Sequence, residues 1–315
     1  MIEKTLDAKE KMLFTQETNP SSIQPVKLTE NSRIKFRCHP GVSCFTACCG
    51  NIKIILTPYD ILKLTQRLEI AAHEFLHLYT VPTYLEKTDM PGVMIKMGDE
   101  DNKCPFVTPE GCIVYTDRPS ACRYYPVGMA DFHEGGSKDA DGNELVSREE
   151  KFYFLVKEDY CKGHEEDKEW TVAEWRVDQG IDVRDDMNKK WLRLIMRRKS
   201  YGHQASLSEQ AKRMFFMTST DLAHFRRFIF ESSFLKTYEI DPVLIEKIRI
   251  DDVALMLFSF DYLANSLFGA EIPGMTINKE KIKEKVVEIK ARQDEAVISA
   301  VKDYEEMKKA RETEE

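Results

Sequence analysis

The residues of this sequence that can do chemistry are its cysteines, and all of them lie in the first half of the 315-residue chain. A thiolate is a nucleophile and a ligand for soft metals, so clustered cysteines support either redox chemistry or metal binding. Five and three residues separate the first cysteines, and seven and nine separate the later ones. We therefore predict a metal site built from eight thiols: Cys38, Cys44, Cys48, Cys49, Cys104, Cys112, Cys122 and Cys161.

The size of this thiol set leaves the number of metal centres open. A tetrahedral ion needs four ligands, so eight cysteines with His39, His133 and His164 nearby could fill two four-ligand sites or one multinuclear site. Zinc, iron and an iron–sulfur cluster are the candidate occupants, whereas calcium and magnesium prefer oxygen ligands. An iron–sulfur cluster is our first choice because thiolates outnumber the histidines. A redox dithiol set without metal and ordinary core thiols are the alternatives.

The adjacent pair Cys48 and Cys49 limits how the ligands can be shared. In extended backbone, successive side chains point to opposite sides, so both thiols reach one small ion only through a sharp turn. If there are two sites, we expect this pair to divide between them.

Composition and charge exclude several classes of protein. The net charge is −8, with 42% hydrophobic and 32% charged residues, and the chain lacks a concentrated basic surface for nucleic acid. No apolar run approaches the roughly 18 residues that span a bilayer. The segment Met1–Lys4 is charged and has no apolar signal core, so we expect a cytoplasmic protein with reduced thiols.

The elements around the cysteines can be placed from local signals. Thr57, Pro58 and Asp60 supply an N-cap, a first-turn proline and a first-turn acid, which predicts a helix over 58–67. Residues 106–107 and 113–115 should form a hairpin that holds Cys104 near Cys112. Further strands are expected at 52–56, 93–97 and 152–156, and a second helix at 71–79. From residue 172 onward the pattern is helical, over 172–179, 183–199, 207–217, 220–236, 241–248, 252–268 and 279–312.

These elements predict an α+β cysteine module followed by an all-helical lobe. We expect a polar arm at 1–30, a metal-binding domain at 31–165, a helical domain at 166–278 and a charged C-terminal helix at 279–315. The helical half is a candidate surface for a protein partner. The sequence assigns no catalytic residue and does not decide whether the protein is an enzyme.

One segment resembles a known family. Residues 112–126 fit the pattern C-x-[IV]-Y-x-x-R-P-x-x-C-R-x-[YF]-P of the YkgJ-type cysteine-cluster family, a zinc- or iron-chelating CxxCxxCC domain. The Cys48–Cys49 pair, the segment 56–61 and Cys104-Pro105-Phe106 support the resemblance, which covers about residues 36–164. The opening spacing departs from the family's C-x-x-C-x-x-C-C, which weakens the assignment of Cys38 as a ligand.

The resemblance implies a metal or iron–sulfur site held by the cysteines of this module, including Cys161. One related group resembles flagellin lysine methylases, so protein lysine N-methylation is a further alternative, although the chain has no Gly-rich nucleotide loop. A structural zinc module that presents the helical lobe to a partner is another. Arg118 and Arg123 flank Cys122 and either donate to the thiolates or form surface salt bridges.

Overall fold

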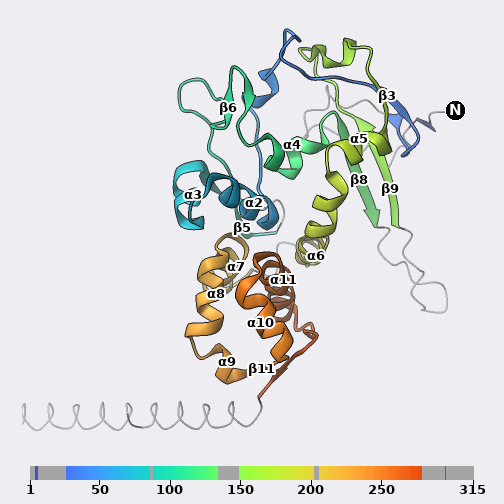
Figure 1. The fold of residues 1–315 in the computed structure, drawn as a ribbon. Coiled ribbons are helices and arrows are strands. Elements are labelled where there is room, and N and C mark those ends of the chain that lie inside the picture. The colour runs from blue at the N-terminus through green and yellow to red at the C-terminus, as the bar shows by residue number, and fades with distance from the viewer. Residues whose placement is uncertain are drawn as a thin grey trace, which may run out of the picture. The chain divides into compact units, whose positions relative to one another are not determined.

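A computed structural model describes residues 4–5, 26–85, 88–133, 149–201, 206–278 and 295 (Figure 1). The chain divides into two compact units, Met1–Leu222 and Ala223–Glu315. Most of the predicted polar arm and, apart from Glu295, the predicted C-terminal helix lie outside the described residues. The domain border expected near residue 165 stays a prediction.

The first unit combines short strands with helices, which confirms the predicted α+β class. Its strands pair two by two and antiparallel, as β1 with β2, β3 with β10, β4 with β5, β6 with β7 and β8 with β9. The longest pair, β8 and β9, forms a ribbon that is visible in Figure 1. The strand bounds are Lys4–Thr5 (β1), Val26–Lys27 (β2), Arg33–Lys35 (β3), Thr80–Leu85 (β4), Met90–Ile95 (β5), Val107–Thr108 (β6), Gly111–Cys112 (β7), Val127–His133 (β8), Glu149–Leu155 (β9) and Glu169–Thr171 (β10).

The α-helices of this unit lie close to the predicted ranges, except α4, which the sequence analysis did not predict. The α-helices are Pro58–Leu68 (α2), Ala72–Tyr79 (α3), Ser120–Tyr124 (α4), Val172–Asp178 (α5), Ile181–Ser200 (α6) and Glu209–Thr220 (α7). Three short 3₁₀ helices are Ala47–Cys49 (η1), Tyr115–Asp117 (η2) and Lys162–Glu165 (η3). The hairpin prediction is confirmed, but its second arm ends at Cys112, and η2 occupies residues that we expected to be strand.

The predicted strand at 52–56 is not a regular strand. Ile55 forms only an isolated bridge to Met94, although Leu56 N–H donates to Val93 O at 3.0 Å and Ile95 N–H to Ile54 O at 2.9 Å. Residues 52–56 therefore lie along β5 as an extended segment that leads directly into α2.

A buried carboxylate connects three helices of the first unit. Asp60 is fully buried and completes a capping box with Thr57 at the start of α2. Its Oδ1 accepts from the Ser120 amide at 2.9 Å and the Ser120 hydroxyl at 2.8 Å at the start of α4. Arg184 of α6 pairs with the same oxygen at 3.4 Å. Asp60 thus fixes α4, which carries Cys122, against α2 and α6.

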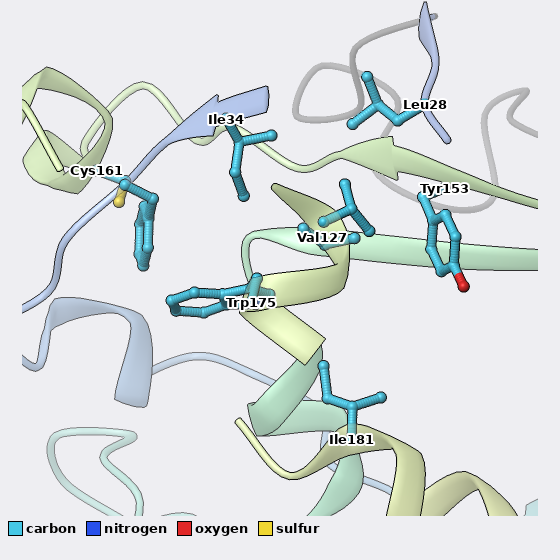
Figure 2. Close-up of a cluster of buried hydrophobic side chains, with 9 residues drawn as sticks. Leu28, Ile34, Val127, Tyr153, Cys161, Trp175 and Ile181 are labelled. Atoms are coloured by element: carbon cyan, nitrogen blue, oxygen red, sulfur yellow. The ribbon is translucent and has the colours of Figure 1, made fainter. Parts of the chain in front are cut away.

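Two hydrophobic clusters fill the first unit, and cysteines pack against both. The first core, drawn in Figure 2, includes Cys161 itself, and Cys44 packs against it. The second core has Cys104, Cys112 and Cys122 packed against it. The first core is Leu28, Ile34, Phe36, Val127, Tyr153, Cys161, Val172, Trp175 and Ile181. The second core is Ile54, Leu56, Ile61, Leu64, Phe75, Val93, Ile95, Phe106 and Val114.

The second unit is helical, with one short strand pair. Phe225 packs its ring near those of Phe258 and Tyr262, with centroids 6.3 and 5.6 Å away. Arg226 pairs with Asp252 at 2.6 Å. Its elements are Leu222–Glu231 (α8), Phe234–Thr237 (α9), Tyr238–Ile240 (β11), Pro242–Ile250 (α10), Asp252–Phe268 (α11) and Met275–Ile277 (β12). Among the helices described in either unit, none has the length and apolarity needed to cross a membrane.

We expect Asp60→Ala to lower the free energy of unfolding of the first unit by about 3 kcal/mol or more, because it leaves Arg184 buried without its partner. Urea denaturation measures this loss. The control is Asp167→Ala, since the Asp167 side chain is 99% exposed and pairs only with Lys35, so the expected change is under about 0.5 kcal/mol. Equal stability of the two variants would contradict the central role of Asp60.

Candidate metal centre

The loop between β3 and α2 carries four cysteines and is shaped by turns. Thr46 and Asn51 bracket η1 with left-handed backbone, at φ 66° and 52°. Asn51 N–H donates to Asn102 O at 2.9 Å, and Cys104 N–H donates to Cys49 O at 2.8 Å. These two bonds hold the loop against the segment that begins the β6–β7 hairpin.

Cys38, Cys44, Cys48 and Cys161 form one neighbourhood, which we call the first sulfur set. Arg37 N–H donates to Gly163 O at 3.0 Å, and this bond holds the β3 end beside the Cys161 segment. Lys162 N–H donates to Cys44 Sγ at 3.1 Å. Burial, followed by the negative charge of Cys48, Cys44 and Cys161, raises the pKa of Cys38 to about 11.

Cys49, Cys104, Cys112 and Cys122 form the second sulfur set. Cys112 stands opposite Val107 in the hairpin, and Val107 N–H donates to Cys104 O at 3.1 Å. Cys122 is carried by α4. Burial raises the pKa of Cys122 to about 12, and the charges of Cys104 and Cys112 add to the rise. Burial also raises the pKa of both Cys104 and Cys112.

The two sets meet at Cys48 and Cys49. The pair lies in η1 rather than in extended backbone, so our geometric reason for separating the two thiols does not apply as stated. The thiols share a hydrogen bond, which lowers the pKa of Cys48 to about 7 and raises that of Cys49. Apart from this contact, Cys49 is influenced by Cys104 and Cys122, and Cys48 influences Cys38. The pair therefore joins the two neighbourhoods.

Arg118 and Arg123 interact with different groups: Arg118 acts on the thiols, and Arg123 donates to backbone carbonyls. The charge of Arg118 lowers the pKa of thiols in both sets, Cys38 and Cys48 in the first and Cys112 and Cys122 in the second. Its guanidinium lies 4.0 Å from the ring centroid of Tyr115 and donates to Gln179, and only 8% of the residue is exposed. Arg118 is therefore the cation that both sets share.

Arg123 donates hydrogen bonds to backbone carbonyl oxygens. It donates to Arg118 O at 3.0 Å, to Gln179 O at 2.6 Å and to Thr116 O. Burial and the like charges of Arg184 and Arg118 lower its pKa to about 10, so it stays charged at neutral pH. Because it holds η2, α4 and the end of α5 together, it is neither a surface ion pair nor a donor to sulfur.

The histidines are placed differently from the thiols. His39 Nε2 contacts Glu166 Oε2 at 3.0 Å. The His164 ring packs beside Phe36, with centroids 5.1 Å apart, and burial lowers its pKa. His133 ends β8, paired with Glu149. His39 is thus engaged by Glu166, whereas the Nε2 atom of His164 is buried and has no hydrogen-bond partner.

The donor chemistry of the two sets fits a soft metal. All eight cysteines are free of disulfides. Their burial and mutual repulsion oppose ionisation, and a cation in their midst would reverse both effects. Within the described ranges no three Cys, His, Asp or Glu side chains are already grouped tightly enough to hold an ion. A metal bound by either set would draw the sulfurs together.

Sequence reasoning missed two oxygen groups beside the first set. The Oε2 atom of Glu158 and the hydroxyl of Tyr125 are buried, and the two side chains lie beside one another. The charge of Glu158 raises the pKa of Cys48, and burial together with hydrogen bonds to Cys161 and Glu158 raises the pKa of Tyr125. The available signal was position, because Glu158 precedes Cys161 by three residues and Tyr125 follows Cys122 by three.

Comparison with known proteins assigns this region to a family. Residues 37–162 match the model of the CxxCxxCC family, described as a "Putative zinc- or iron-chelating domain". The match confirms, over these residues, the resemblance suggested by the sequence motif. No curated protein and no solved structure matches the chain.

We expect Arg123→Gln to lower the free energy of unfolding of the first unit by about 3 kcal/mol, because buried carbonyl oxygens lose a charged donor. Arg33→Gln is the control, since Arg33 and its partner Glu169 are 71% and 50% exposed. Urea denaturation measures the free energy of unfolding of both variants. An Arg123 variant as stable as the Arg33 variant would contradict the stabilising role of the Arg123 hydrogen bonds.

Proposed function

We propose that the protein binds two metal centres, one on each sulfur set, and that an iron–sulfur cluster is the preferred occupant. The observation that carries this proposal is the grouping of eight free thiols into two neighbourhoods, each supported by its own hydrophobic core. Four thiolates complete the ligand set of an iron–sulfur cluster or of a tetrahedral zinc ion.

The ligand type supports iron–sulfur over zinc. Each set supplies four sulfurs, and the Nε2 atom of His39 is engaged by Glu166. Iron–sulfur clusters are held mostly by Cys thiolates, whereas mixed Cys and His ligands are common for zinc. When bound, such a cluster supplies electron transfer or Lewis acidity. Arg118 would balance part of the negative charge of both thiolate sets. A reducing cytoplasm would keep these thiols available.

A structural zinc module that presents helices to a protein partner is the second candidate. One observation favours a partner: Val243 and Ile250 of α10 are 77% and 83% exposed, although both are large and apolar. In this case zinc removal would unfold the cysteine module, because the binding energy of structural zinc is folding energy.

Protein lysine N-methylation is a third candidate, and it rests on the family resemblance alone. It requires S-adenosylmethionine. Isothermal titration of the metal-loaded protein tests it, and no heat of binding would remove this candidate.

The principal test is anaerobic purification followed by elemental analysis and visible spectroscopy. We expect iron and acid-labile sulfide, with broad visible absorption. Cys122→Ser and Cys161→Ser should each remove one centre and leave the other, because their thiols belong to different sets. Arg33→Gln is the matched control and should keep the full metal content. A colourless, zinc-loaded protein would exclude the iron–sulfur assignment, and a metal-free one would exclude both.

A further inference from the structure

The outer face of α6 carries a concentrated group of positive charges. Asp186 and Glu209 are the nearest acidic residues on either side of this stretch, and the sequence between them contains none. The exposed cations of α6, which we call the basic face, are Lys189, Lys190, Arg193, Arg197 and Lys199. Because the whole chain has a net charge of −8, this local excess is opposite in sign to the protein as a whole.

The inner side of α6 belongs to the cysteine module. Asn188 Nδ2 donates to Ser120 Oγ at 3.3 Å, at the start of the helix α4 that carries Cys122. Arg198, which is buried, pairs with Asp89 at 2.6 Å. One side of α6 is therefore used by the fold, and the basic face lies on the other side of the same helix.

The energetics of an isolated helix do not account for the basic face. Lys189, Arg193 and Arg197 follow one another at intervals of four residues, and like charges at this spacing destabilise a helix. The helix dipole favours cations in the last turn, whereas Lys189 and Arg193 lie before it. Among the residues that the structure describes, no carboxylate pairs with either of these two. The repeated positive charge therefore favours a negatively charged partner.

Two apolar side chains adjoin the basic face and narrow the choice of partner. Leu192 and Met196 are 46% and 40% exposed. Residues three apart are neighbours on a helix, so Leu192 adjoins Lys189 and Met196 adjoins Arg193. Met and Arg are enriched at protein interfaces, whereas phosphate binding needs no apolar centre and a helix on a membrane presents a wider apolar face. The composition therefore favours an acidic protein surface.

We propose that the basic face, together with Leu192 and Met196, is the docking surface for a small acidic electron-transfer protein. This inference rests on the proposed iron–sulfur function and names the partner of that site. One electron passes from the reduced carrier to the oxidised cluster, so the carrier is oxidised by one electron, the cluster is reduced by one, and no bond forms or breaks. Encounters of this kind bury a small area and are steered by charge, which suits two apolar side chains beside a row of cations.

The packing of α6 places this surface close to the cysteine module. Its inner side packs against α4, through the bond from Asn188 to Ser120. A carrier on the outer side is therefore separated by one helix from the segment that carries Cys122.

Binding of two acidic one-electron carriers, plant-type ferredoxin and flavodoxin, tests the surface independently of any activity. The full chain is titrated with each oxidised carrier by isothermal titration calorimetry at low and at high salt. We expect binding of at least one carrier, weakened by salt, and about tenfold weaker binding after Lys189→Glu or Arg193→Glu. The control is Arg227→Glu, the same exchange at an exposed position of α8, which should leave the affinity unchanged.

The Arg193→Glu variant is suited to this test because it should keep the fold. It places an acid four residues from a cation on either side, a spacing that stabilises a helix. If neither carrier binds, or if Arg193→Glu binds as tightly as wild type, the docking surface is overturned. Binding of the basic face to duplex DNA or to phosphatidylserine vesicles, with no binding of either carrier, would overturn it as well.

Stopped-flow reduction separates failure of this inference from failure of the proposed function. Dithionite needs no docking surface, so it should bleach the visible absorption of wild type and Arg193→Glu at the same rate. The reduced carrier should bleach the variant about tenfold more slowly than wild type. A protein with no cluster to bleach overturns the proposed function, whereas equal rates with the carrier overturn the docking surface alone.

Discussion

The carboxylate of Asp60 is the interaction on which the cysteine module most depends. It is buried, and its hydrogen bonds and ion pair reach the start of α2, the start of α4 and the first turn of α6. A buried charge is tolerated only when donors surround it, so these three elements can assemble in one arrangement only. That arrangement positions α4 and therefore Cys122, which this helix carries and which packs against the second core.

The arginines of the motif extend the same polar network. Arg123 closes the backbone around α4 by donating to carbonyl oxygens on both sides of it. Arg118, held by Gln179 and stacked on Tyr115, keeps its charge within reach of thiols from both sets. Arg123 thus satisfies backbone carbonyls, whereas Arg118, five positions earlier, offsets the negative charge of the thiolates. Their proximity to Cys122 alone does not distinguish these tasks.

The division of the thiols follows from the division of the hydrophobic core. Cys161 belongs to the first core and Cys44 packs against it, whereas the hairpin cysteines and Cys122 pack against the second. Each set is therefore supported by its own packing, and the contact between Cys48 and Cys49 is the place where they meet. Each set also has a carboxylate near it, since Glu158 acts on the Cys48 thiol and Asp60 on the Cys122 thiol.

The sequence by itself determined the local features. The cap at Thr57, the proline that follows it, the hairpin turn and the helical periodicity all act over a few residues, which is why α2, the β6–β7 hairpin and most helices could be predicted. The run 52–56 could not be assigned correctly, because an apolar extended segment becomes a strand only where a partner completes its hydrogen bonds.

Only the tertiary structure decided which thiols are neighbours and which arginine lies near the sulfurs. Cys44 and Cys161 interact although they are 117 positions apart in the chain, and no local rule brings them together. Their meeting depends on backbone bonds such as Arg37 to Gly163 and on the packing of the first core. Local propensity acts through neighbouring residues, whereas a metal centre depends on the convergence of distant segments, and that convergence is set by packing and buried charge.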